Sequence, residues 1–505
     1  MAETFHIPHQ CKLYTAENSR IADRMTIDEF GIDGFTLMEI AAYSAAGHII
    51  KNEKKLRKGL IICGKGNNAG DALAVARYLI NDAGHEIIIY PVFGTDDLSQ
   101  DAEKNLKLLK TLEKNGASLK IIDDVEDLNL YSFDYCVDGI FGTGLNSSIN
   151  KPLSDLFERL NSSELTVYSM DVPSGLNADT GEIHGTCLKA HKTFTFGTNK
   201  IGFHLSNAQA YCGDVVYIKL PFPNYVLHES AVLINSELYN NLPPNLHKPN
   251  HKYDGGVVHI VAGSEGLTGA AIMAAKSAWK QGAGAVFLYA PKKLLPVYEI
   301  ALPQIIKIAV GSENDTFFKE DHLQTILSAI ERKKGVLLIG PGIGTRPETR
   351  SLVQSLLLNF NDDVIIDADA LAAWQEIKML SDKQKKNWLL TPHQGESEKW
   401  LGNTSKNDAE RFKWVVNFSK EQNCNLFLKG YPAFLAVTKS TPFITGYNTS
   451  IFNRAGFGDV LAGAISAKIA IDKSIQTGTI RALYETFSAL SSSNSEKMTA
   501  PENLL

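Results

Sequence analysis

Short apolar runs alternate with segments of helical period in two long stretches of the chain, and this alternation restricts the fold. Residues 15–220 contain β-rich runs separated by helix-like spacers, among them "GLIICG", "EIIIYPV", "FDYCVDG" and "LTVYSMDV". From Gly256 the alternation restarts with "GVVHIVAG", "AVFLYA", "GVLLIG", "DVIIDAD", "WLLTP" and "NLFLKG". Strands that alternate with helices are typical of mostly parallel sheets covered on both faces. The sequence therefore predicts two α/β domains.

The segment between the two stretches, residues 221–250, is rich in proline and has no sustained period. A chain of 505 residues is also too long for one ordinary core. We therefore predict an N-terminal domain of residues 1–222 and a C-terminal domain of residues 223–505. The Ser-rich end "SALSSSNSEKMTAPENLL" is expected to be a last helix that frays into a tail.

Composition and charge exclude several classes of partner. The formal net charge is −6, and no Lys/Arg stripe interleaved with aromatic residues occurs, so nucleic acid is not expected as a partner. The 6 cysteines form no CxxC pair and have no close histidine, which argues against a zinc site or a disulfide framework and favours the cytoplasm. No apolar stretch of about 18 residues and no leader-like start is present, so neither membrane insertion nor export is expected.

Polar or glycine-rich loops follow several strands in the N-terminal stretch. These loops are "GKGNNAGD", "DGIFGTGLNSS" and "DVPSGLNADTG". Ligands of open parallel sheets bind beyond the carboxyl ends of the strands, so Asn68, Asp71, Asp138 and Asp171 are expected to converge on one crevice. Each loop alone has a steric explanation as a tight turn, but their occurrence together favours a ligand site.

The C-terminal stretch repeats this arrangement around "NRAGFGDVLAGAIS". Glycines ahead of Asp459 predict a tight turn that opens a helix, and "LFLKGYPAF" places Lys429 and Gly430 at a strand end shortly before it. Phosphoryl transfer requires positioning and N–H donors for developing charge, which a glycine turn and a helix N-terminus supply. Asp459 is then the base that takes a hydroxyl proton. The alternative is that Asp459 only caps the helix.

The ordered set of motifs resembles a known family. "GKGNNAGD", "DGIFGTGL" and "MDVPSGLNADTG" look like an NAD(P)H-hydrate epimerase domain, while "GPGIG", "DADAL", "LTPHQGE", "LKG" and "GFGDVLAG" look like an NAD(P)H-hydrate dehydratase domain, a relative of ribokinase-type kinases. Over nearly its whole length the chain resembles the bifunctional nicotinamide nucleotide repair enzymes. The resemblance implies an N-terminal Rossmann-like three-layer α/β/α domain and a C-terminal ribokinase-like α/β domain.

The resemblance also implies a reaction. NADH or NADPH that has taken up water on its nicotinamide ring is repaired: the first domain interconverts the R and S forms of NADHX or NADPHX, and the second dehydrates the S form with an adenine nucleotide. A potassium ion, Mg²⁺ and ADP or ATP are implied, as are a cytoplasmic location and a homo-oligomer. The sequence does not decide between ADP and ATP.

The roles of individual residues follow from the resemblance alone. Asp171 is implied as the acid/base residue of the epimerase, and Asp459 as the residue that activates the ring hydroxyl for phosphorylation; both also contact substrate. The implied potassium ligands are Asn68, Asp138 and Ser174. The residues implied to hold the hydrated dinucleotide in the epimerase are Asn67, Asn68, Ala69, Gly70, Asp71, Gly142, Thr143, Gly144, Leu145, Asn146, Ser147 and Ser148. In the dehydratase, the residues implied to contact the hydrate are Ala271, Gly344 and His393, and those implied to contact the nucleotide are Lys429, Gly430, Tyr431, Pro432, Ala433 and Gly458.

The chain departs from the family pattern at several motif positions. Ala69 and Ala72 stand in "NNAGDA" where the family has "NNGGDG", and they are expected to narrow the first loop and to resist a positive φ. Phe457 replaces a small hydroxyl residue and is expected to lie beside the phosphate, and Ala433 replaces a common Thr. Three other readings therefore stay open: a ribokinase-type small-molecule kinase, a nucleotide-binding protein with one or both sites decayed, and, with less support because no G-x-G-x-x-G follows the first strand, an NAD-dependent oxidoreductase.

Overall fold

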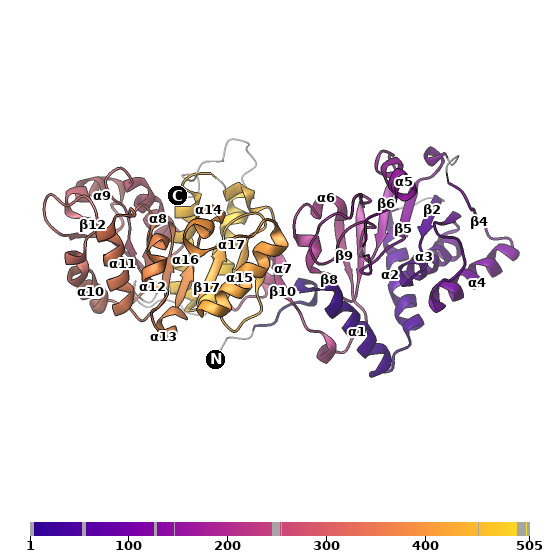
Figure 1. Ribbon diagram of the computed structural model, residues 1–505, viewed down its shortest axis with the longest axis horizontal. Helices are drawn as coiled ribbons and strands as arrows, with labels where there is room; N and C mark the ends of the chain where they lie inside the picture. Colours follow the sequence, from indigo (N-terminus) through magenta and orange to yellow (C-terminus); the bar gives the residue numbers. More distant parts are fainter. Residues whose placement is uncertain are drawn as a thin grey trace. The chain divides into compact units, whose positions relative to one another are not determined.

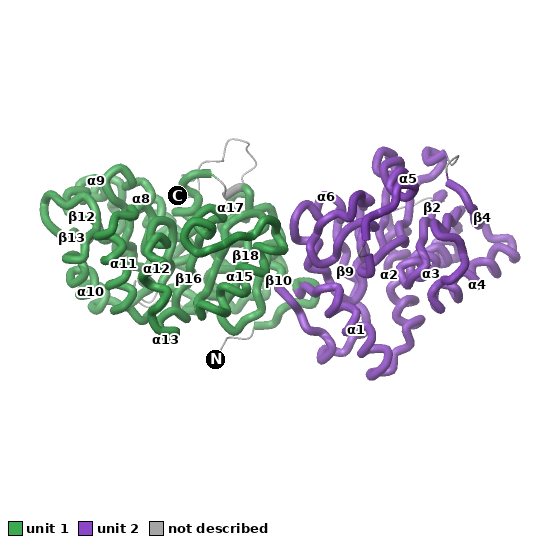
Figure 2. The backbone as a smooth tube through the Cα atoms, in the orientation of Figure 1, with its two compact units in different colours: residues 1–11, 232–505 green, residues 12–231 purple. Residues whose placement is uncertain are grey.

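The computed structural model of the chain describes residues 5–52, 57–125, 129–145, 147–244, 253, 255–452, 454–491 and 501. It divides into two compact units (Figure 2). The N-terminal unit is Lys12–Ala231, and the C-terminal unit combines Met1–Cys11 with Val232–Leu505. Within the described ranges, no helix has the length and apolar character needed to cross a membrane.

The N-terminal unit is built on a parallel seven-stranded sheet in the order β4-β3-β2-β5-β6-β7-β9. Its strands are β2 Lys58–Cys63, β3 Glu86–Pro91, β4 Leu119–Ile121, β5 Tyr135–Gly139, β6 Thr166–Met170, β7 Lys192–Phe196 and β9 Asp214–Ile218. Its helices are α1 Ala16–Asp28, α2 Gly34–Asn52, α3 Asn67–Ala83, α4 Gln100–Lys114, α5 Lys151–Asn161 and α6 Gln209–Cys212. From β2 the chain turns to β3 on one side, while β5 lies on the other, so the order reverses between β2 and β5.

Both faces of this sheet are covered by helices, which explains its continuous apolar strands (Figure 1). Ile61 and Cys63 of β2 pack with α2, α3 and α4, whereas the alternate residues Leu60 and Ile62 pack with α5. Side chains of a strand point alternately to the two faces, so a strand buried on both reads as an unbroken hydrophobic run.

A separate short pairing completes the N-terminal unit. Strand β1 (Lys12–Tyr14) runs parallel to β8 (Asn199–Lys200), with Tyr14 opposite Lys200. Strand β8 begins only three residues after β7 ends, because the chain turns at Gly197, which has a φ of +66°. This turn places Lys200 close to the carboxyl end of the main sheet.

The C-terminal unit contains strands in the order β13-β12-β11-β14-β15-β16-β17-β18-β19-β10. These are β10 Ala231–Ile234, β11 Val257–Val261, β12 Ala285–Pro291, β13 Ile306–Val310, β14 Val336–Ile339, β15 Val364–Ile366, β16 Trp388–Leu390, β17 Asn425–Leu428, β18 Phe434–Ala436 and β19 Phe443–Thr445. All neighbours pair in parallel except β18, which is antiparallel to both β17 and β19. The order reverses at β11, which lies between β12 and β14.

Helices enclose this second sheet, and two of them form much of its core. The helices are α7 Ser236–Asn240, α8 Thr268–Lys280, α9 Leu295–Ala301, α10 Leu323–Arg332, α11 Pro347–Asn359, α12 Trp374–Ile377, α13 Asp382–Lys385, α14 Gln394–Glu396, α15 Asp408–Gln422, α16 Phe457–Asp472 and α17 Ile475–Ser491. Small residues of α8 and α16, including Ala274 and Gly463, allow a close approach: a Cβ atom at Gly463 would lie 2.2 Å from the carbonyl oxygen of Ala274. The tail expected after the last helix lies outside the described residues, apart from Pro501.

The compact units differ from the predicted domain bounds at both ends of the N-terminal domain. Cys11 is fully buried in the core of the C-terminal unit, and its thiol donates to the Asn235 side chain at 3.3 Å. At the other end, Val226 and Leu227 pack with Tyr14 in the N-terminal unit. The segment in which the domain boundary was predicted contains β10, which pairs with β19, and the compact units divide at residue 231.

Candidate active sites

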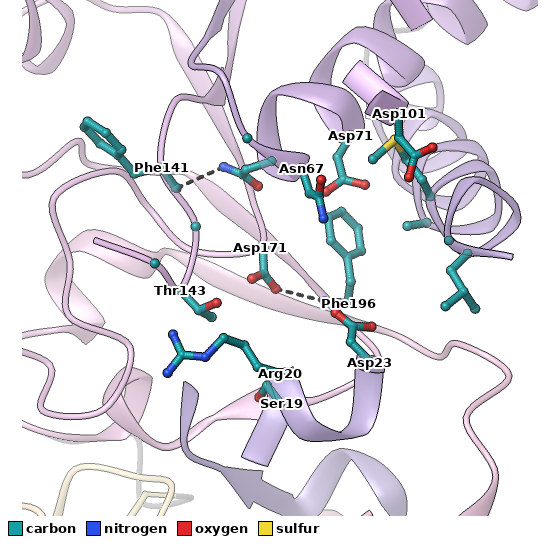
Figure 3. A pocket seen from close by; sticks show the side chains of 18 of the residues that line it. Ser19, Arg20, Asp23, Asn67, Asp71, Asp101, Phe141, Thr143, Asp171 and Phe196 are labelled. Carbon is teal, nitrogen blue, oxygen red and sulfur yellow. Dashed lines mark hydrogen bonds between the residues drawn. The ribbon is translucent and has the colours of Figure 1, made fainter. Parts of the chain in front are cut away.

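A cavity of about 830 Å³ lies at the carboxyl ends of β2, β5, β6 and β7 in the N-terminal unit. This is the place where the strand order reverses, as expected for a ligand site in an open parallel sheet. Figure 3 shows side chains from α1, α3 and the strand-end loops around it.

The structure brings most of the predicted epimerase residues together around this cavity. Those in its lining are Asn67, Asn68, Asp71, Gly142, Thr143, Gly144, Leu145 and Asp171. The predicted residues that do not line it are Ala69, Gly70, Asp138, Ser147, Ser148 and Ser174. Asn146 lies outside the described residues.

Asp138 is fully buried beneath the cavity and accepts hydrogen bonds at both of its oxygens. Ser174 donates to it through its hydroxyl at 2.6 Å and its backbone N–H at 2.8 Å, Ser169 donates at 2.9 Å, and the Ile140 N–H donates at 3.2 Å. Burial raises the pKa of Asp138, although these donors oppose the rise. The carboxylate therefore joins the loops after β5 and β6.

Asn68 is the predicted cation ligand with an unsatisfied oxygen. Its side-chain N–H donates to the carbonyl oxygen of Phe141 at 2.9 Å, but its Oδ1 atom is buried and has no hydrogen-bond partner among the described residues. A Cβ atom at Gly142 would lie 3.6 Å from Asn68 and also from Asp171 Oδ2. A buried carbonyl oxygen without a donor suits a hard cation.

Asp171 follows β6 with a φ of +57°, a left-handed conformation that is uncommon outside glycine and occurs at functional sites. Its backbone N–H donates to Phe194 at 2.7 Å, and its Oδ1 atom accepts from the Phe196 N–H at 3.4 Å and from the ammonium of Lys200. Lys200 is only 2% exposed. The sequence analysis did not single out Lys200, because a lone lysine after a strand carries no motif.

Two further carboxylates face Asp171 across the cavity, Asp23 from α1 and Asp71 from α3 (Figure 3). Asp23 lines the cavity but is exposed; partial loss of its hydration there raises its pKa to about 6, and the charge of Asp171 adds to the rise. Burial also raises the pKa of Asp71 well above its usual value, with Asp171 and Asp23 contributing. Asp23 was not predicted from the sequence. The available signal was that Asp23 lies four residues after the buried Ser19 on α1, which places both residues on the same side of the helix.

The expected strain at Ala69 and Ala72 does not occur, which corrects that prediction. Both residues lie inside α3, where the backbone is helical and no positive φ is needed. Both are fully buried, and a Cβ atom at Gly139 would lie 2.4 Å from the methyl group of Ala72. The two alanines therefore pack inside the unit and do not narrow the cavity.

A second cavity, of about 780 Å³, lies at the carboxyl ends of β15, β16 and β17 in the C-terminal unit. The N-terminal turn of α16 forms another wall. The predicted residues in its lining are His393, Lys429, Gly430, Ala433, Gly458 and Asp459, together with Phe457. Ala271, Gly344, Tyr431 and Pro432 do not line it, and Ala271 is fully buried in the core.

The turn predicted around Asp459 is confirmed. Gly456 has a φ of +90° and directly precedes α16, and Asp459 lies in the first turn of this helix. Burial raises the pKa of Asp459 to about 7, with the charge of Asp367 adding to the rise and that of Lys429 opposing it. Phe457 is 1% exposed, so its ring is packed into the fold.

Lys429 forms an ion pair with Asp367, which is fully buried and also accepts a hydrogen bond of 2.7 Å from Thr391. Burial alone would lower the pKa of Lys429, but the charges of Asp367 and Glu396 outweigh it and raise the pKa. Within the part of the chain that the structure describes, the second oxygen of Asp367, Oδ2, is buried without a hydrogen-bond partner. A Cβ atom at Gly458 would lie 3.5 Å from Lys429 Nζ, so the ammonium reaches the helix N-terminus.

His393 precedes α14 and acts as its N-cap. Its ring Nδ1 atom accepts a hydrogen bond from the backbone N–H of Glu396 at 3.3 Å. The backbone N–H of His393 in turn donates to the Glu396 carboxylate at 2.8 Å. The lining also contains Lys406, Arg411 and Arg454, which the sequence analysis did not select. These basic side chains add positive charge beside the α16 turn, as the binding of a polyphosphate requires.

Comparisons with known proteins match both units. Residues 34–202 match the family described as YjeF-related protein N-terminus, and residues 258–504 match the family described as NAD(P)H-hydrate dehydratase. A bifunctional NAD(P)H-hydrate repair enzyme of Dictyoglomus turgidum is 33% identical over 479 residues, which cover 93% of this chain and 91% of that protein. The enzyme of the same name from Salinibacter ruber is 31% identical over 472 residues, covering 89% and 86%. A solved NAD(P)H-hydrate dehydratase of Bacillus subtilis, co-crystallised with ATP and Mg²⁺, covers 54% of this chain and 94% of its own at 20% identity, with a TM-score of 0.45.

Proposed function

The chain belongs to the bifunctional NAD(P)H-hydrate repair enzymes, and we propose that its two cavities carry out the two steps of that repair. Such an enzyme interconverts the R and S forms of NADHX or NADPHX and dehydrates the S form to NADH or NADPH. One observation carries the proposal: each matched region contains a cavity at the carboxyl edge of its sheet, with Asp171 in the first and Asp459 in the second.

In the N-terminal cavity, Asp171 moves the proton of the epimerisation. The α3 N-terminus at Asn67 and Asn68 presents backbone N–H groups to an anion, and the loop Gly142–Leu145 lies opposite, so both suit the phosphates of a dinucleotide. Nearby, Asn68, Asp138 and Ser174 would hold a potassium ion. Asn68 Oδ1 fits this role directly because it is buried and unsatisfied, and the ion would supply positive charge beside the Gly142 loop.

In the C-terminal cavity, Asp459 takes the proton of the ring hydroxyl as that oxygen attacks the terminal phosphorus of ADP or ATP. The N–H groups at the start of α16 and the ammonium of Lys429 receive the developing charge. The phosphate then leaves, and the ring double bond returns.

Magnesium would arrive with the nucleotide. Among the described residues no cluster of three or more His, Cys, Asp or Glu side chains is arranged to hold a metal alone. Mg²⁺ is commonly bound by one or two carboxylates together with substrate phosphates. Asp367, with its unsatisfied Oδ2 atom, suits that role, and the ion would neutralise phosphate charge.

We also propose that the protein works in the cytoplasm and as a homo-oligomer. All six cysteines are buried free thiols, which supports a reducing compartment such as the cytoplasm. Self-association into a homo-oligomer stays a prediction from the family resemblance, and sedimentation of the purified chain checks it.

The experiment uses a mixture of R and S hydrates of NADH. With the protein, Mg²⁺, potassium and ADP or ATP, the absorbance of reduced nicotinamide is expected to return for the whole mixture, because the R form is converted to the S form. Recovery of the S fraction alone would contradict the epimerase half of the proposal. A stable phosphorylated product without NADH would indicate a small-molecule kinase instead.

A further inference from the structure

Lys200 is a buried cation whose hydrogen-bonding capacity is fully used. Its ammonium donates to Asp171 Oδ1, to the hydroxyl of Thr195 at 3.0 Å and to the carbonyl oxygen of Thr198 at 3.0 Å. An ammonium has three donors, and a charge this deeply buried is costly unless it is paired. Lys200 is therefore held in one geometry by three acceptors.

The fold fixes Lys200 and Asp171 through the same segment. Asp171 is bonded through its backbone to Phe194 and through its side chain to the N–H of Phe196, both at the end of β7. The turn at Gly197 leads into β8, where pairing with β1 sets the position of Lys200. Position and direction of the Asp171 carboxylate thus depend on this strand end.

Other carboxylates lie around Asp171. Asp23 faces it from α1 and Asp71 from α3, with Asp101 of α4 acting in turn on Asp71. Neither Asp23 nor Asp71 has a hydrogen-bond or ion-pair partner among the residues that the structure describes, whereas Arg20 of α1 pairs with Glu17 at 2.9 Å. Neighbouring carboxylates do not ionise independently, and an adjacent cation decides which of them keeps its charge.

We propose that Lys200 is a positioning residue of the epimerase, which aims the Asp171 carboxylate into the cavity as the base while Asp23 or Asp71 serves as the acid. This inference rests on the epimerase function proposed above. It assigns the base to the carboxylate that contacts Lys200, and the acid to the carboxylates without such a contact.

The roles follow from the chemistry of the hydrate. Dihydronicotinamide contains an enamine, so water adds with its oxygen on the carbon next to the ring nitrogen. In epimerisation the Asp23 or Asp71 carboxylic acid protonates this hydroxyl, the C–O bond breaks, and water leaves as the nitrogen lone pair forms a C=N⁺ bond. Water then adds to the opposite face and gives its proton to Asp171. Proton exchange with solvent restores both groups, and no oxidant is needed.

The raised pKa values of Asp23 and Asp71 agree with this division, since both retain protons at higher pH than a free carboxyl group. The same cavity therefore offers an acid and a base at one pH, as inversion of the hydroxyl-bearing carbon requires.

The test compares Lys200→Met with Lys200→Arg in the full chain. Interconversion of R-NADHX and S-NADHX is followed by chromatography without nucleotide. Lys200→Met is expected to lower kcat by about 10²-fold, as a misplaced catalytic group does, with a much smaller change in KM. The pH profile of epimerisation by this variant is expected to differ from that of the wild type, because the cation beside the catalytic carboxylate has been removed. Lys200→Arg keeps the charge and should restore the wild-type profile, even where it lowers kcat.

Lys385→Met is the matched control, since Lys385 is also buried, at 6% exposure, but lies in the C-terminal unit. It should change stability without changing the pH profile of epimerisation. If Lys200→Met is insoluble, Lys200→Gln replaces it, with the same change in the pH profile expected. A folded variant with wild-type kcat or with the wild-type pH profile would overturn the role of Lys200 alone. A wild-type chain that does not interconvert the hydrates would instead refute the epimerase function.

Discussion

The two cavities contain the same kinds of charged group but pair them differently. Each has a lysine that is ion-paired with a carboxylate, and further carboxylates, at the carboxyl edge of a mostly parallel sheet. In the N-terminal cavity Lys200 pairs with Asp171, the proposed catalytic carboxylate itself. In the C-terminal cavity Lys429 pairs with Asp367 and leaves Asp459 in the first turn of α16.

In the proposed mechanism, it is ion pairing rather than the kinds of residue present that distinguishes the roles of these carboxylates. Asp459 is not the direct partner of the lysine, and burial raises its pKa to about 7, close to the ideal for a base that works at neutral pH. In the other cavity the raised pKa values belong to Asp23 and Asp71, the neighbours of the paired carboxylate. This contrast agrees with the proposed functions, in which the first cavity exchanges protons reversibly and the second removes a single hydroxyl proton.

Asp459→Asn tests the C-terminal half of this comparison with the largest expected effect. Loss of a positioned base should lower dehydration of S-NADHX by about 10²- to 10⁴-fold, while nucleotide binding changes much less because Gly458 and Lys429 remain. Absorbance at the reduced-nicotinamide band and calorimetric titration with ADP or ATP measure the two effects. A folded, fully active variant would leave Asp459 with only a capping role, worth about 0.5–2 kcal/mol of stability.

Asp171→Asn tests the N-terminal half. The change is nearly isosteric, so the unit should stay folded, but epimerisation should fall by a factor at the lower end of the same range, about 10²-fold, because Asp23 and Asp71 remain as weaker substitutes. In a mixture of hydrates the S form should still be dehydrated, and the R form should persist. Equal loss of both activities would show that the two cavities are not chemically independent.

The pH dependence of dehydration sharpens the contrast. Asp459 must be ionised to take a proton, so activity is lost as the pH falls through about 7, and the rate at pH 6 should be about tenfold below its alkaline plateau. Initial rates between pH 6 and 8.5 measure this limb. Epimerisation in the same samples depends on other carboxylates. If both reactions lost activity over the same pH range, Asp459 would not be the source of the pH dependence of dehydration.

The smallest expected effect is a change in stability, and it tests which of the two units residues 5–11 belong to. Cys11→Ala removes a buried thiol from the core of the C-terminal unit and should lower its free energy of unfolding by about 1 kcal/mol. Calorimetry should show this unit's transition shifted down by about 2–4 °C. Cys187→Ala, in a core cluster of the N-terminal unit, is the matched control and should shift the other transition. If Cys11→Ala instead shifted the N-terminal transition, the division of the chain at residues 11 and 231 would be wrong.

The periodicity of the sequence predicted the helices and strands that can be recognised within a single segment. The strands from "GLIICG" to "NLFLKG" and the helix after Gly456 are all confirmed, because the hydrophobic pattern of a buried strand or an amphipathic helix repeats within a few residues. The family resemblance is confirmed by the matched regions and relatives. The short strands β1, β8 and β10 were not predicted, since pairs of two to four residues have no period of their own.

The parts of the sites that sequence did not predict depend on contacts between distant segments. Lys200 reaches Asp171 only because β8 pairs with β1, and Asp23 faces the cavity only because α1 packs beside it. Phe457 lines the second cavity and is 1% exposed, and its expected place beside a phosphate stays a prediction. The potassium and magnesium ligands and the substrate contacts of Ala271 and Gly344 stay predictions.

The burial of Cys11 in the C-terminal unit has a consequence for how the chain is synthesised. Residues 5–11 leave the ribosome before the whole of Lys12–Ala231, yet the residues against which they pack, such as Asn235, are translated after it. At about 5–20 residues per second, the wait is on the order of tens of seconds. The N-terminal unit therefore has time to fold during translation. The C-terminal unit can fold only later, when residues 5–11 meet the segment that follows the folded N-terminal unit in the chain. Slow translation downstream of residue 231 should leave residues 5–11 exposed for longer. A chaperone that binds nascent chains would then have the most time to bind these residues.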